Sequence, residues 1–90
     1  SKYEIHVARH YYDLDAYVAT VNRCKYVLEN YQQTPAVEDA LGIMSMAYMK
    51  MGYTDLMDDA LRVLKLNFPD SGYFKRIARM KNGEAKDDAG

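Results

Sequence analysis

The single cysteine is the first residue whose type suggests chemistry. Cys24 stands between Arg23 and Lys25, and a reactive thiolate needs positively charged, partly exposed surroundings. Adjacent residues on a helix point in different directions, so neither cation is expected to face the sulfur. Cys24 also falls at helical spacing with the apolar residues Val21 and Val27. We therefore interpret Cys24 as a small core residue, and a lone cysteine cannot form a disulfide within the chain.

Two histidines form the second group that could do chemistry. His6 and His10 are four residues apart and would share one helix face, and Asp13 could add a third metal ligand. The sequence has no HExxH pattern. We interpret both histidines as exposed or as packed between repeats, and expect no metal site.

Acidic pairs form the third group. General acid–base catalysis needs carboxylates that face each other across a pocket, whereas adjacent residues on a helix diverge. No glycine-rich phosphate loop or nucleophile–histidine–acid set is present. The sequence therefore predicts no enzyme and no cofactor, and the pairs are expected on solvated helix faces or in the tail: Glu38/Asp39, Asp58/Asp59 and Asp87/Asp88.

Length and charge narrow the class of protein. The chain has 90 residues and a formal net charge of −1, which favours one small domain and argues against nucleic-acid binding, since phosphate contacts need a basic excess. No apolar run is long enough to span a bilayer. The first residues carry no initiator Met or signal peptide, and we expect the sequence to be part of a longer protein.

The elements that must position these residues are helices. Glycine and proline are scarce, five and two, and apolar residues recur at helical spacing in five segments, which predicts an all-α fold. We expect Asp15 and Thr54 to cap the second and fourth helices and Thr34–Pro35 to start the third. Gly52 is expected to end the third helix in a left-handed conformation, and Pro69 to stop the fourth. In the run 43–51 we place Met44 and Met51 in the core, and Met46 and Met49 towards a neighbouring helix or partner.

A shift of 37 residues aligns the chain with itself. It places Tyr11 on Tyr48 and Asp15 on Gly52, as a repeated helical hairpin would. The second unit fits the tetratricopeptide pattern of bulky, small, aromatic, glycine and proline positions, at Leu41, Met44, Ser45, Tyr48, Gly52, Leu61 and Pro69. The first unit has Asp15 where glycine is usual and Gln32 where proline is usual. The alternative is a plain antiparallel helical bundle.

This pattern divides the chain into four parts. We predict tetratricopeptide repeats over 1–32 and 33–69, a C-terminal capping helix over 70–82 and a disordered tail over 83–90. Two repeats are few for a stable solenoid, so the exposed ends leave room for a dimer or a domain swap of this fragment.

The outside of the second predicted helix is a candidate docking surface. With Cys24 inward, Arg23 and Tyr26 fall towards the opposite side with Ala19 and Asn30. Tyrosine and arginine are enriched at interface hot spots. The competing interpretation is that a preceding repeat covers this strip, or that Tyr26 is an ordinary surface tyrosine.

The run from Tyr17 to Arg23, aromatic-Val-Ala-x-Val-Asn-Arg, together with Tyr31 and the segment 34–41, resembles the C-terminal repeats of the BamD (ComL) family. These are tetratricopeptide lipoproteins of the bacterial outer-membrane β-barrel assembly machinery. The resemblance covers residues 2–69. It implies a periplasmic protein at the outer membrane, held there by an N-terminal lipid on a cysteine other than Cys24.

The resemblance also implies partners. The family's C-terminal repeats dock the membrane-proximal POTRA domain of the barrel subunit BamA and meet small accessory lipoproteins. Arg23 matches the family arginine that pairs with an acidic group of that domain. We call the six expected contact residues the docking face: Arg23, Asn22, Tyr26, Tyr17, Asp13 and Asp15. The alternative function is a tetratricopeptide scaffold that binds a peptide in its concave groove, lined by residues such as Tyr48 and Met51.

Overall fold

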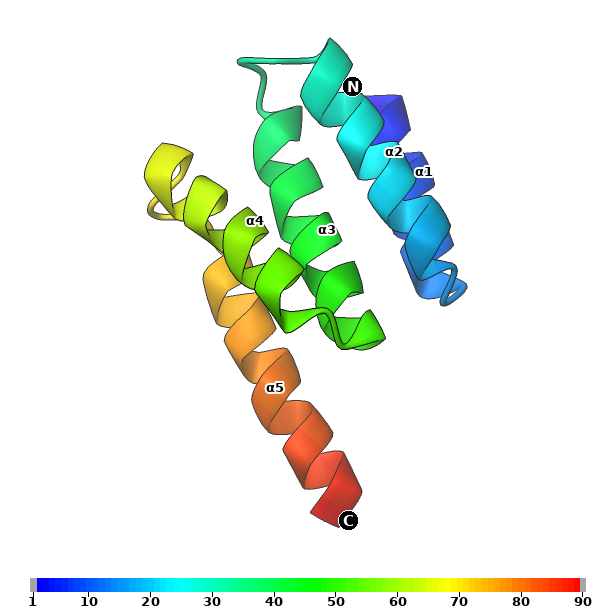
Figure 1. The fold of residues 1–90 in the computed structure, drawn as a ribbon, viewed down its shortest axis with the longest axis vertical. Helices are drawn as coiled ribbons and strands as arrows, with labels where there is room; N and C mark the ends of the chain where they lie inside the picture. Colours follow the sequence, from blue (N-terminus) through cyan, green and yellow to red (C-terminus); the bar gives the residue numbers. More distant parts are fainter. Residues whose placement is uncertain (1, 90) are drawn as a thin grey trace.

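Residues 2–89 fold into five helices joined by short turns (Figure 1). The structure is a computed structural model that describes residues 2–89, with side chains described through residue 83. The helices are α1 (Lys2–Asp13), α2 (Tyr17–Asn30), α3 (Ala36–Met51), α4 (Thr54–Asn67) and α5 (Tyr73–Ala89), and residues 2–89 contain no strand. The all-α prediction is therefore confirmed.

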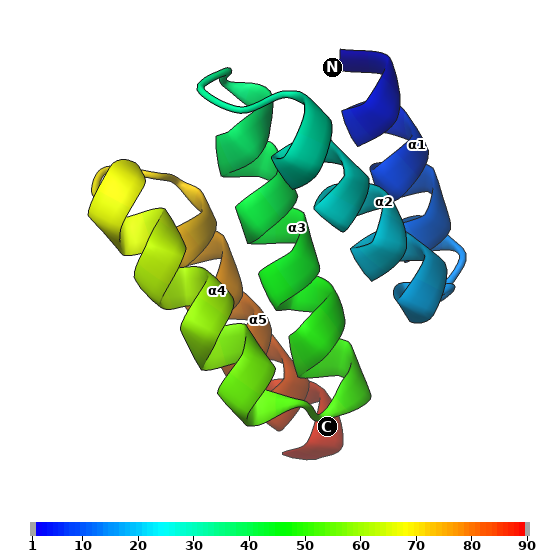
Figure 2. The same ribbon diagram turned by 45° about the horizontal axis from the view of Figure 1, so that its top comes forward.

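Helix α3 is the centre of the fold. In the views of Figures 1 and 2, α1 and α2 lie on one side of it and α4 and α5 on the other. Every residue from Ala40 to Tyr48 is buried, including Met44 and Met46. A helix that is apolar nearly all round is stable only when neighbours cover it on every side. Met46 therefore faces a neighbouring helix and not a partner, whereas Met49 and Met51 are half-buried.

The turns of the two hairpins repeat with the 37-residue shift. After α1, the N–H of Ala16 donates to the carbonyl of Tyr11 over 2.9 Å. After α3, the N–H of Tyr53 donates to the carbonyl of Tyr48, also over 2.9 Å. In each turn this hydrogen bond gives a partner to a carbonyl near the helix C-terminus that would otherwise have none within the helix. The same turn at the same shift supports tetratricopeptide-type hairpins over a plain bundle.

Asp15 takes the conformation of the glycine that it replaces. Its φ is 61°, and that of Gly52 is 79°, so both residues occupy the left-handed region in which aspartate is among the tolerated side chains. The expectation that Asp15 caps α2 is wrong, because Ala16 is the N-cap and no side chain caps this helix. The Asp15 carboxylate instead accepts a hydrogen bond from the Tyr17 hydroxyl.

The other helix ends follow the sequence in part. Gly52 ends α3 in the left-handed conformation, as predicted, and α4 ends at Asn67, ahead of Pro69. Thr54 is the first residue of α4 and provides no cap, because Tyr53 is the N-cap residue. Helix α3 begins at Ala36, one residue after Pro35.

Helix α5 is fastened to α3 through Tyr73. A Cβ atom on Gly42 would lie well under 3.0 Å from carbons of the Tyr73 ring, so only glycine leaves room for the ring there. The Tyr73 hydroxyl donates to Asp39 over 2.8 Å and accepts from Arg9 over 2.7 Å. Burial, and then the hydrogen bond to the Asp39 carboxylate, raise the pKa of Tyr73 to about 12. This cluster ties α1, α3 and α5 together.

Helix α5 also runs past its expected end. Its backbone is helical to Ala89, where a disordered tail was expected from residue 83, and Gly90 lies outside the described residues. The division of the chain into two repeats and a capping helix remains a prediction. No helix in the described part of the chain combines the length and apolarity needed to cross a membrane.

Candidate functional site

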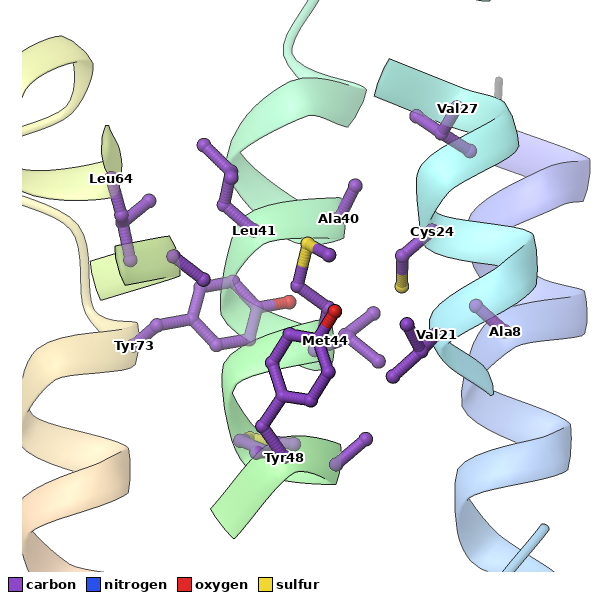
Figure 3. Packing of buried hydrophobic residues seen from close by; sticks show 14 of the residues in the cluster. Ala8, Val21, Cys24, Val27, Ala40, Leu41, Met44, Tyr48, Leu64 and Tyr73 are labelled. Carbon is purple, nitrogen blue, oxygen red and sulfur yellow. The ribbon is translucent and has the colours of Figure 1, made fainter. Parts of the chain in front are cut away.

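Cys24 lies inside the molecule, as predicted. Its side chain is fully buried, and in Figure 3 its sulfur points from α2 towards α3, beside Val21 and Met44. Burial raises the pKa of the Cys24 thiol to about 12. A buried thiol that stays protonated is a poor nucleophile.

The two histidines lie on the surface of α1. Both His6 and His10 are exposed. Among residues whose side chains are described, no three histidine, cysteine or acidic side chains are grouped so that they could hold a metal ion.

Three residues of the docking face lie together on the outside of α2. Arg23, Asn22 and Tyr26 line an open hollow of about 320 Å³ with Ala19 and Tyr11. Tyr26 is 43% exposed, and the guanidinium carbon of Arg23 lies 5.6 Å from the centre of its ring. An arginine whose guanidinium lies over a tyrosine ring, beside an amide side chain, can bind a carboxylate on another protein.

Arg23 also has a partner within the chain. Its Nη1 donates to Oε2 of Glu4 on α1 over 2.9 Å. The Arg23 side chain is 35% exposed and that of Glu4 is 13% exposed, so the pair lies at the edge of the α1–α2 contact. Arg23 thus takes part in the contact between α1 and α2 and also lines the hollow.

The remaining residues of the docking face belong to the turn before α2. Tyr17 packs against the core, and its hydroxyl donates to Asp15 over 2.8 Å. Burial, and then the Asp15 carboxylate, raise the pKa of Tyr17. Asp13 is exposed at the end of α1. Among the described residues, no hydrogen bond or ion pair joins this turn to Arg23.

A larger hollow lies elsewhere, between α1 and α3. It has a volume of about 580 Å³ and is lined by Lys2, Ile5, His6, Arg9, Pro35, Ala36 and Asp39. Tyr48, which the alternative function placed in the groove, is buried in the core instead.

Glu4 and Tyr11 lie beside Arg23 and were not predicted from the sequence. The signal was present in the repeat, because the 37-residue shift pairs Glu4 with Leu41 and Arg23 with Ala60. The first repeat therefore has an acidic and a basic residue at the two positions where the second repeat has two apolar residues. The Arg9–Asp39–Tyr73 cluster was missed as well, since its members lie far apart in the sequence.

The family model of an outer membrane lipoprotein, YfiO, matches residues 1–64. The chain belongs to this family. It is 43% identical over 70 residues to the outer membrane protein assembly factor BamD of Neisseria meningitidis serogroup A, a match that covers 78% of this chain and 26% of the relative. The factor of the same name from Xylella fastidiosa strain Temecula1 is 36% identical over 75 residues, 83% of this chain and 26% of the relative.

A third relative with this name comes from Haemophilus influenzae. It is 34% identical over 67 residues, which cover 74% of this chain and 26% of the relative. The chain thus spans about a quarter of the length of the curated relatives that it matches. The resemblance seen in the Tyr17–Arg23 run is confirmed at the level of the family.

Proposed function

We propose that this chain is a non-catalytic docking module that acts in outer-membrane protein assembly. The module would belong to a lipoprotein held at the periplasmic face of the outer membrane. Its surface on α2 would dock the membrane-proximal POTRA domain of the barrel subunit BamA, and neighbouring surfaces would meet accessory lipoproteins. The relatives are named outer membrane protein assembly factors, and this name supports the proposed role in outer-membrane protein assembly.

The exposure and surroundings of the Arg23 guanidinium are the main support for this docking surface. The guanidinium is partly exposed, lies over the Tyr26 ring and borders an open hollow. Arginine and tyrosine at the centre of an interface often contribute much of its binding free energy. A partner carboxylate that reaches the remaining guanidinium N–H groups would form a charge-assisted hydrogen bond, and this bond would fix the register of the complex.

The test is a charge reversal at Arg23. Arg23→Glu is expected to weaken binding to the POTRA domain by about 30-fold or more, since losing one partner of a desolvated charge pair costs about 2–5 kcal/mol. Lys25→Glu is the matched control, because Lys25 is exposed on the same helix but lies outside the docking face. Calorimetric titration measures the affinity, and a melting curve checks the fold. Equal affinities for the parent and Arg23→Glu would refute the proposal.

A second candidate function is peptide binding in the hollow between α1 and α3. Its lining combines the apolar residues Ile5, Pro35 and Ala36 with the cations Lys2 and Arg9. In that case the partner would contact α1, and a photoreactive side chain at His6 would crosslink to it.

A further inference from the structure

The ion pair between Glu4 and Arg23 is unusual for its place in the fold. It joins α1 to α2, and the buried residues of these two helices are apolar except for Thr20. Glu4 retains only 13% of its side-chain exposure, so its carboxylate has lost much of its contact with water. Removing a charge from water costs free energy that the attraction of its partner only partly returns.

The second hairpin closes without such a pair. At the positions that correspond to Glu4 and Arg23 through the 37-residue shift, it has Leu41 and Ala60, and both are buried. Apolar residues in place of a buried ion pair are often neutral or stabilising. The packing of the hairpin therefore does not require a charged pair here.

The contact leaves donors on Arg23 for another molecule. A guanidinium has five N–H groups, and Glu4 accepts from Nη1. Among the described residues no other hydrogen-bond acceptor of Arg23 is found, and its guanidinium carbon lies over the Tyr26 ring, 5.6 Å from the ring centre. Glu4 and Tyr26 together restrict a side chain that would otherwise sample many rotamers.

We propose that Glu4 is a positioning residue of the docking face, which holds the Arg23 guanidinium in place before the partner binds. This inference rests on the proposed function and names a residue that supports it from another helix. The partner carboxylate accepts hydrogen bonds from the guanidinium N–H groups that Glu4 does not use, and it does not displace Glu4. Binding then avoids the entropy cost of ordering a long side chain.

Two substitutions separate positioning from charge. Glu4→Gln keeps an acceptor oxygen for Nη1 and removes the negative charge, whereas Glu4→Leu copies Leu41 of the second hairpin and removes the acceptor. We expect Glu4→Gln to bind the POTRA domain within about twofold of the parent, and Glu4→Leu to bind about two- to tenfold more weakly, as expected for ordering one side chain. Glu29→Ala on the exposed part of α2 is the matched control and is expected to leave the affinity unchanged.

The other outcomes overturn the inference. If both Glu4 variants bind more tightly, Glu4 masks Arg23 and does not position it. If Glu4→Leu binds like the parent, the contact has no role in docking. In an Arg23→Ala background Glu4→Leu is expected to add no further loss, and an equal loss there would also overturn the inference.

A measurement on the free chain separates this inference from the proposed function. Relaxation of the Arg23 Nε–Hε group in nuclear magnetic resonance is expected to show an ordered side chain in the parent and in Glu4→Gln, and a mobile one in Glu4→Leu. If Arg23→Glu fails to weaken POTRA binding, the proposed function is wrong while this result still tests the positioning. An equally ordered Arg23 in Glu4→Leu would refute the positioning whatever the partner.

Discussion

The close approach of Tyr73 to Gly42 predicts a large effect from one methyl group. In Gly42→Ala the new Cβ would overlap the Tyr73 ring, so the ring must move. Overpacking of this kind costs about 1–3 kcal/mol, and alanine returns about 1 kcal/mol through its higher helix propensity. A displaced ring also strains the bonds from its hydroxyl to Asp39 and Arg9, which are worth about 1–2 kcal/mol.

These contributions give a net destabilisation of about 2 kcal/mol, or roughly 10 °C in Tm for a chain of this length. The assay is urea and thermal unfolding followed by circular dichroism. Gly83→Ala is the matched control, because a Cβ at Gly83 in α5 meets no atom within 4 Å. This control is expected to leave the free energy of unfolding unchanged or to raise it.

A double-mutant cycle isolates the contact with the ring. In a Tyr73→Ala background the space is open, so Gly42→Ala is expected to become neutral or to stabilise by up to about 1 kcal/mol. Two results would contradict a clash between a Cβ at position 42 and the Tyr73 ring: Gly42→Ala as stable as the parent, or the same loss of stability in both backgrounds.

The titration of Cys24 and Tyr73, the burial of Cys24 and the backbone conformation of Gln33 each have a measurable consequence. In the folded chain the pKa values of Cys24 and Tyr73 are raised to about 12, from 9.0 and 10.0. The unfolded chain therefore loses these protons first, so the free energy of unfolding should fall as the pH rises from 9 towards 12. Urea titrations at several pH values measure this fall, which should be shallower in Tyr73→Phe. Alkylation of Cys24 at pH 8 should be slow in buffer and fast in urea; rapid labelling of the folded chain would contradict its burial. Gln33→Gly should stabilise the chain by up to about 1 kcal/mol, because Gln33 has a φ of 61°, whereas Gln32→Gly should not; equal melting temperatures would exclude strain at Gln33.

Much of the fold could be predicted from local signals. The apolar spacing around Cys24 gave the correct inward face of α2, and Gly52 marked a helix end because few other residues adopt its φ. The 37-residue shift held even at Asp15, where the residue type differs but the left-handed conformation does not. These features depend on residues close together in the chain.

The errors arose where a side chain had more than one available partner. Asp15 was expected to cap α2, but its carboxylate binds the Tyr17 hydroxyl. Glu4 and Arg23 are 19 residues apart, and Tyr73 is 34 residues from Asp39. Contacts at such separations depend on how helices pack, and helical spacing within one segment does not specify them.

Site-specific photocrosslinking can show whether the outside of α2 meets the partner. A photoreactive side chain is placed at Tyr26, on the docking face, or at His6, in the hollow between α1 and α3. We expect a crosslink to the POTRA domain from position 26, lost on Arg23→Glu, and none from position 6. A crosslink from position 6 with none from position 26 would contradict it.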